Sequence, residues 1–215
     1  MSRKVEPQEG VVKFELHFTR AAPPDFAPLR ALNTWRTLLH RLGLIGQEPA
    51  RYGGVGFGNV SQRLVGDPTG FVITGTQTGG LAALTAGQYT VIDACDIERN
   101  RVVAHGPIEP SSESLTHAML YRLSPDIRYV FHVHAPLLWR RAQALGIACT
   151  RPDVAYGTPA MAAEMECLYR AGDLARQGIV AMGGHEDGVV AFGASADDAG
   201  LTLVRALLKA LARGD

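Results

Sequence analysis

Two histidines stand two residues apart within an apolar run, and this spacing can bind a metal ion. The run extends from Tyr129 to Pro136, and its histidines are His132 and His134. If the run is a β-strand, both side chains lie on one face with their Cα atoms roughly 6.7 Å apart. Two such imidazoles can converge on an ion through bonds of about 2.0 to 2.1 Å. The spacing alone leaves open a pH-sensitive or hydrogen-bonded pair.

A further ligand must come from elsewhere in the chain. His185 lies in a glycine-rich loop between two apolar runs, residues 179–182 and 189–192. Three neutral imidazoles hold a divalent ion and leave a position open for a substrate oxygen. With a charge of about +2, such an ion acts as an electron sink for a bound substrate.

Three turns rich in glycine and hydroxyl groups are candidates for binding an anion. They are residues 53–61, 74–80 and 110–113. The first does not have the spacing of a dinucleotide-binding loop, and the second lacks the lysine of a P-loop. Backbone N–H groups and a helix N-terminus can still bind a phosphate. A bulged strand and turn explains the first segment equally well.

The third turn precedes a predicted helix from Glu113 to about Leu123, with Ser111 or Ser112 as its N-cap. Capping alone is sufficient to explain these residue types. Near an ion, Glu113 could also transfer a proton, but burial raises a carboxyl pKa while a cation lowers it, so the sequence does not decide its charge. His117 lies one turn later and is a further ligand, a partner of a ligand or a packed side chain.

Strands and helices alternate along the whole chain. This order predicts one α/β or α+β domain without internal repeats. The expected strands are residues 11–18, 70–73, 89–94, 101–104, 129–134, 179–182 and 189–192, and the expected helices are residues 29–42, 113–123, 136–144, 159–177 and 195–212.

The composition argues against several classes of protein. The 215 residues, 47% of them hydrophobic, are sufficient for a single core. Lys plus Arg and Asp plus Glu balance at 21 each, so we expect no nucleic-acid or membrane partner. The N-terminus is polar and lacks a secretory h-region, which predicts a flexible segment over residues 1–10 and a cytoplasmic location. The three cysteines form neither a disulfide framework nor a CxxC motif.

Taken in order, these motifs resemble the class II aldolase/adducin family. The resemblance covers about residues 30 to 210 and rests on Gly58–Ser61, Ile73–Thr76, Pro110–Glu113, His132–Ala135 and His185. It implies a single α/β domain over residues 1–215, built as a three-layer α/β/α sandwich around a mainly antiparallel sheet. It also implies a homotetramer with sites between neighbouring subunits.

The resemblance further implies the roles of individual residues. A divalent metal, normally Zn²⁺ with Mn²⁺, Co²⁺ or Fe²⁺ as alternatives, is expected at His132, His134 and His185. Glu113 is expected as a fourth ligand or as the catalytic acid/base. The phosphate of a sugar-phosphate-like substrate is expected at Asn59, Ser61, Thr74, Gly75, Ser111 and Ser112.

These roles imply a metal-dependent lyase of aldol type that acts on a small phosphorylated ketose through a metal-stabilised enediolate. A sugar-phosphate 4-epimerase or a ketose-phosphate dehydratase would use the same site. An interaction module without catalytic activity, as in adducin, is the alternative of a different class.

Three departures from the usual family pattern bear on the substrate. The usual Thr-Pro-Thr-Gly turn is replaced by Thr74–Gln77, and the usual His-Gly pair by His185–Glu186. The segment after the two-histidine strand is shorter than in sugar-phosphate aldolases, where it carries a tyrosine proton donor. Tyr156 follows this segment, and the sequence does not establish it as that donor.

Overall fold

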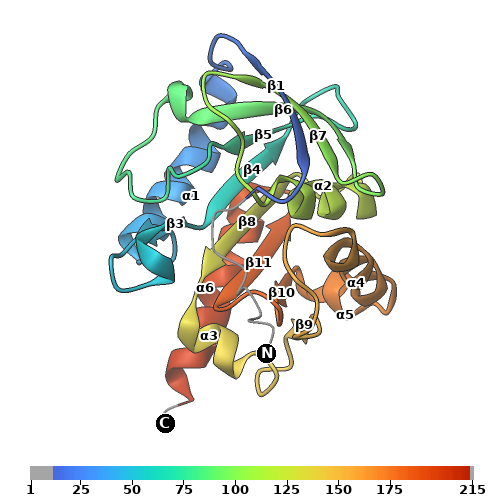
Figure 1. Ribbon diagram of the computed structural model, residues 1–215. Coiled ribbons are helices and arrows are strands. Elements are labelled where there is room, and N and C mark those ends of the chain that lie inside the picture. Colours follow the sequence, from blue (N-terminus) through green and yellow to red (C-terminus); the bar gives the residue numbers. More distant parts are fainter. Residues whose placement is uncertain (1–11, 214–215) are drawn as a thin grey trace, which may run out of the picture.

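A sheet of nine strands runs through the computed structural model, which describes residues 12–213 (Figure 1). The predicted flexible N-terminus, residues 1–10, lies outside the described residues. In spatial order the strands are β1 (Glu15–Arg20), β7 (Arg101–Gly106), β6 (Tyr89–Asp96), β5 (Phe71–Thr74), β4 (Asn59–Arg63), β8 (Tyr129–His134), β11 (Gly188–Gly193), β10 (Ile179–Ala181) and β9 (Ala148–Cys149). A separate small ribbon pairs β2 (Gly46–Gln47) with β3 (Gly56–Phe57).

The sheet is mixed. Its two edge pairs, β1 with β7 and β9 with β10, are parallel, and every other neighbouring pair is antiparallel. The antiparallel centre includes β8, which lies between β4 and β11. The strand that carries two of the histidines therefore has hydrogen-bonded neighbours on both sides, which fixes its register.

Alternating side chains on the strands enter two separate hydrophobic clusters. Phe71, Ile73 and Val130 belong to one cluster, whereas Val72 and Phe131 belong to the other. Because successive strand residues point to opposite faces, the two clusters lie on opposite sides of the sheet. Central strands with apolar residues on both faces are typical of a sheet covered by helices.

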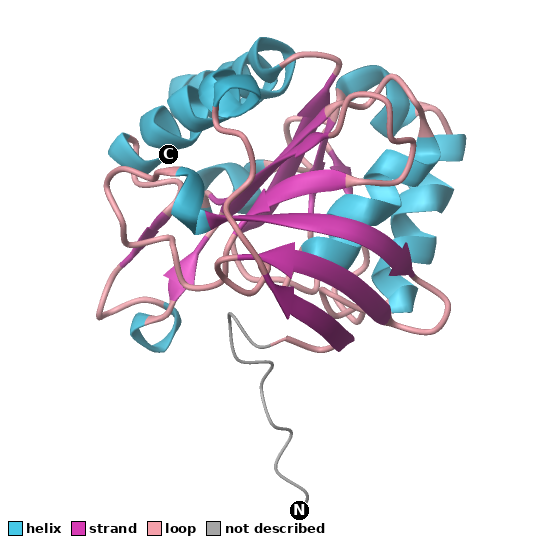
Figure 2. Ribbon diagram, turned by 90° about the horizontal axis from the view of Figure 1, so that it is seen from above, coloured by secondary structure: helices cyan, strands magenta, loops and turns pink. Residues whose placement is uncertain are grey.

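Helices flank the sheet on both of these sides (Figure 2). Side chains of α2, α4 and α5 enter the first cluster, and those of α1, α3 and α6 enter the second. The α-helices are α1 (Arg30–Arg41), α2 (Ser114–Leu123), α3 (Pro136–Arg141), α4 (Pro159–Arg170), α5 (Asp173–Gln177) and α6 (Ala196–Ala212), with short 3₁₀ turns at Ala27–Leu29, Tyr52–Gly54 and Ala86–Gln88. None of the helices in the described part of the chain combines the length and apolar character needed to cross a bilayer.

The helical cover does not extend over the whole sheet. In β7, buried Val102 and Ala104 alternate with partly exposed Val103 and His105. His105 Nδ1 lies 2.9 Å from Asp93 Oδ2 of β6, and both side chains are exposed. The expected α/β fold with a large central sheet is present, but the predicted three-layer arrangement is not confirmed.

Two of the predicted helices have other first or last residues in the structure than the sequence predicts. Helix α2 begins at Ser114, and neither Ser111 nor Ser112 caps it, because Glu113 occupies the N-cap position without a side-chain cap bond. Ser111 instead forms a turn in which its hydroxyl accepts from the Glu113 N–H at 3.3 Å.

The helix predicted over residues 159–177 is two helices. Pro159 begins α4, as predicted, and Thr158 caps it by accepting from the Met161 N–H. The chain then breaks at Gly172, whose φ of 92° is one that glycine adopts without strain. The predicted cap at Ser195 is present, as a capping box with Asp198.

Candidate metal centre and anion pocket

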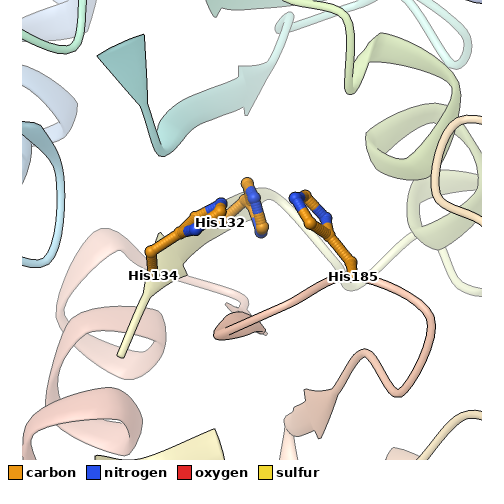
Figure 3. Close-up of side chains that lie close together, drawn as sticks. All are labelled: His132, His134 and His185. Atoms are coloured by element: carbon orange, nitrogen blue, oxygen red, sulfur yellow. The ribbon is translucent and has the colours of Figure 1, made fainter. Parts of the chain in front are cut away.

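The three predicted histidines meet in the interior of the protein (Figure 3). Their candidate ligand nitrogens all lie within 4.8 Å of one another. His132 and His134 are fully buried, and His185 is 4% exposed. The structure therefore brings together side chains that are distant in the sequence.

Strand pairing and a tight loop position these rings. His132 lies opposite Asn59 of β4 and Val190 of β11, so its side chain projects from the middle of the sheet. His185 lies in the loop between β10 and β11, where its N–H donates to the Met182 carbonyl at 3.2 Å. Gly184 brings this loop against the chain near Val154, where a Cβ would lie 1.9 Å from the Val154 carbonyl oxygen.

The surroundings keep the imidazoles of His132 and His134 neutral. Burial lowers the pKa of both rings well below its usual value, and the neighbouring His185 adds to the shift. Neither ring nitrogen of His132 makes a hydrogen bond with another described residue. A neutral imidazole offers a lone pair, and buried nitrogens without partners are costly unless a ligand satisfies them. The donor set therefore fits a divalent metal that accepts nitrogen ligands.

Glu113 lies beside the three histidines. It is 1% exposed, and its Oε1 lies 3.5 Å from His185 Nδ1. Its other oxygen, Oε2, accepts from the Thr116 hydroxyl at 2.8 Å. Glu113 does not belong to the group of three mutually close ligand residues. It lies next to that group and contacts it at His185.

Tyr156 backs the cluster on the His185 side. Its ring stacks on that of His185, with centroids 4.2 Å apart and planes inclined by 24°. The Lys13 ammonium lies 3.4 Å from the centroid of the Tyr156 ring. Tyr156 is 1% exposed, so its ring packs against the histidine as part of the wall.

Tyr52 was not identified from the sequence, although it borders the cluster on the His134 side. Its ring meets that of His134 edge to face, with centroids 4.5 Å apart. Its hydroxyl donates to Asp187 Oδ2 at 2.6 Å and accepts from Arg51 at 2.8 Å. Tyr52 and Asp187 have positive φ values of 48° and 61°. Such backbone strain is concentrated at functional sites, but neither position carries a sequence signal for it.

A small polar pocket lies close to the histidines. Its volume is about 20 Å³, and it is lined by Gly56, Gly58, Asn59, residues 75–79, Ser111 and Ser112. Four of the six predicted substrate-binding residues are in this lining: Asn59, Gly75, Ser111 and Ser112. The exposed side chain of Gln77 closes the pocket, since its Oε1 accepts from the Gly56 N–H at 3.1 Å.

The remaining two predicted residues lie outside the pocket lining. The Ser61 hydroxyl is fully buried, 2.6 Å from His117 Nδ1 and 2.7 Å from the Tyr121 hydroxyl. The Thr74 hydroxyl accepts from the Val60 N–H at 3.2 Å. Of the three roles considered for His117, its contact with Ser61 supports that of a packed side chain. Burial lowers its pKa to about 3.

Comparison with protein families identifies the group to which these features belong. The model of the Class II Aldolase and Adducin N-terminal domain matches residues 50–206. The chain belongs to the class II aldolase and adducin family. The match includes all three histidines, Glu113 and every residue of the pocket lining.

Solved structures similar to this member of the class II aldolase family share its fold. The L-fuculose-1-phosphate aldolase from Thermus thermophilus is 20% identical, with a TM-score of 0.61 over 85% of this chain and 90% of that chain. A sugar-phosphate aldolase from Thermotoga maritima is 17% identical, with a TM-score of 0.62 over 87% and 96%. YgbL from Klebsiella pneumoniae, a putative aldolase/epimerase/decarboxylase, is 18% identical, with a TM-score of 0.61 over 86% and 87%. No curated protein sequence matches the chain.

Proposed function

We propose that this chain is a metal-dependent lyase of aldol type that cleaves or forms a C–C bond in a small phosphorylated ketose. The observation that best supports the proposal is the buried cluster of His132, His134 and His185 with Glu113 beside it. A divalent ion held there, most readily Zn²⁺, supplies when bound an electron-withdrawing centre for the carbonyl and neighbouring hydroxyl of the ketose. Membership of the class II aldolase and adducin family also supports a lyase of aldol type.

Glu113 is proposed as the acid/base. The Thr116 hydroxyl holds Oε2 and leaves Oε1 directed toward His185, at the edge of the cluster. Oε1 is therefore the atom that we propose takes a proton from substrate carbon or oxygen and later returns it.

The polar pocket is proposed as the site of the substrate phosphate. Ser112 of the pocket precedes Glu113 in the chain, and Asn59 of the pocket lies opposite His132 in the sheet. A small substrate can therefore place its phosphate in the pocket and its carbonyl at the histidines. A volume of about 20 Å³ holds about one water, so the phosphate must displace the Gln77 side chain from the Gly56 N–H.

The Ser112→Ala variant tests the phosphate assignment. We expect the KM for a phosphorylated ketose to rise about tenfold, because a hydrogen bond to a charged group is lost. The KM for the same ketose without phosphate should stay unchanged. Steady-state kinetics on both substrates makes the comparison, and equal effects on the two would remove the phosphate from the proposal.

A 4-epimerase or a dehydratase acting on the same site is the second candidate. The similarity to YgbL, whose description includes epimerase and decarboxylase activities, favours keeping it. Product analysis after incubation with a panel of ketose phosphates separates the reactions. Aldol cleavage yields two carbonyl compounds, epimerisation yields an isomer of equal mass, and dehydration lowers the mass by one water.

We also propose that the protein is cytoplasmic and, from the family resemblance, that it is a homotetramer. Native mass spectrometry tests the assembly, since a stable monomer would contradict it. An interaction module without catalytic activity would keep the fold without binding metal, so metal content distinguishes that alternative from the lyase.

A further inference from the structure

Arg36 of α1 is a buried cation that lies directly behind the anion pocket. It is 1% exposed, and its guanidinium donates to the carbonyls of Leu81, Thr78 and Gly79, the last two at 2.8 and 3.0 Å. Thr78 and Gly79 line the pocket. No carboxylate of residues 12–213 lies within 4.0 Å of Arg36, so its charge is balanced only by carbonyl dipoles.

These hydrogen bonds orient the peptide groups of the pocket loop. All described peptide bonds are trans, so the N–H of each peptide points away from its carbonyl. The Thr78 carbonyl faces Arg36, and the Gly79 N–H of the same peptide therefore points away from the guanidinium. Gly79 N lies 3.4 Å from the position that a Cβ on Gly56 would occupy, and both glycines line the pocket. This N–H makes no hydrogen bond with another described residue.

Close packing holds the loop in this orientation. A Cβ on Gly79 would lie 2.5 Å from the Gly46 carbonyl oxygen and 2.8 Å from Phe57 N, both atoms of the β2–β3 ribbon. Gly79 is therefore packed between the ribbon and the carbonyl-binding face of Arg36. A loop whose carbonyls face a cation, with the Gly79 N–H directed to the opposite side, has the polarity that binds an anion.

We infer that Arg36 is a positioning residue for anion binding: it directs the Gly79 N–H into the pocket and supplies the positive charge that the pocket lining lacks. An uncompensated buried charge is costly, and an anion on the other side of the same peptides reduces that cost. The inference rests on the proposed function, in which the pocket takes a phosphate. It adds a positive charge to a pocket whose lining side chains are all neutral.

A second buried arginine provides a matched control. Arg63 of β4 is 7% exposed, and its guanidinium also donates only to carbonyls, those of Ile127, Pro68, Tyr121 and Ser124. Neither Arg63 nor these partners line the pocket. Arg36→Gln and Arg63→Gln therefore make the same chemical change at two places. The first lies behind the pocket, and the second lies away from it.

The test is a titration of the full chain with inorganic phosphate, followed by calorimetry and by the amide resonance of Gly79. We expect Arg36→Gln to weaken phosphate binding about tenfold and Arg36→Lys, which keeps the charge, about threefold. Arg63→Gln should bind like the wild type, and the Gly79 amide should shift on phosphate binding in the wild type.

Each of the following results would overturn the inference. Equal phosphate affinity of the wild type and Arg36→Gln would overturn it while leaving the proposed lyase intact. Equal weakening in Arg36→Gln and Arg63→Gln would assign the effect to general destabilisation. Absence of saturable binding by the wild type would overturn both this inference and the phosphate assignment. If Arg36→Gln does not fold, Arg36→Lys is compared with Arg63→Lys instead. Equal phosphate affinities of these two variants would contradict the inference.

Discussion

At the scale of single residues, Tyr52 connects two histidines that come from different parts of the fold. Its ring contacts His134, and its hydroxyl donates to Asp187, two residues beyond His185. No local pattern selects this tyrosine, because its two partners become neighbours only when β8 pairs with β11, far along the chain from Tyr52.

This contact predicts an effect on metal binding. Tyr52→Phe keeps the ring against His134 but removes both hydrogen bonds of the hydroxyl, so the His185 loop is less firmly held. We expect the affinity for Zn²⁺, measured by chelator competition, to fall about tenfold, the lower end of the effect of losing an outer-shell hydrogen bond at a metal site.

Tyr89→Phe is the matched control for this change. Its hydroxyl donates to Asn33 at 2.9 Å, in the cluster on the α1 side of the sheet. The Zn²⁺ affinity should be unchanged in this variant. A Tyr52→Phe variant that binds Zn²⁺ as tightly as Tyr89→Phe would show that the tyrosine does not support the ligands.

The buried His117 predicts a pH dependence of stability. Its pKa is about 3 in the folded protein because of burial, below the ordinary value of 6.5. The unfolded state therefore binds the proton first, and the contribution of His117 is present above pH 6.5 and is lost as the pH falls toward 3. Urea unfolding of the metal-free protein should show a wild-type free energy that falls by about 1.4 kcal/mol per pH unit more than that of His117→Gln over this window. Parallel pH profiles for the two proteins would contradict the assignment.

At the scale of elements, the loop between β10 and β11 sets the position of His185. Residue 184 approaches the chain near Val154 so closely that only glycine fits, since a Cβ would lie 1.9 Å from a backbone oxygen. The isolated bridge between Ala155 and Gly184 belongs to the same contact.

Gly184→Ala should therefore displace His185. We expect a loss of stability of about 3 kcal/mol or more, because backbone atoms must move, and a lower metal content at equal protein concentration. Gly87→Ala provides the comparison, since a Cβ there would meet only the Thr85 hydroxyl at 3.6 Å. Thermal unfolding and elemental analysis measure both effects, and normal metal content in Gly184→Ala would argue against a fixed loop.

The elements themselves were largely predictable, because alternation and helix caps are local signals. The strand with the two histidines, the Pro159 helix start and the Ser195 cap all agree with the prediction. The break at Gly172 was missed, because a single glycine inside a helical pattern does not distinguish a tolerated residue from a left-handed stop. The start of α2 was shifted because serines that form a turn resemble serines that cap a helix.

At the scale of the whole molecule, the order of the family motifs predicted which distant residues lie close together. Packing determines which atoms their side chains contact. The three histidines converge as expected, whereas Ser61 and Thr74 direct their hydroxyls to internal partners. Arg36 could not have been selected from the sequence, because its contact with the pocket loop depends on how α1 packs behind residues that follow much later in the chain. The mixed sheet edges also depend on long-range pairing that no local pattern encodes.

The most direct measurement is the metal content of the purified protein, compared with that of His132→Ala. The convergence of three buried imidazoles predicts about one divalent ion per chain in the wild type and a marked loss in the variant, with the fold retained. A folded wild type that binds no metal, or a His132→Ala variant that keeps one ion per chain, would contradict the proposed metal centre.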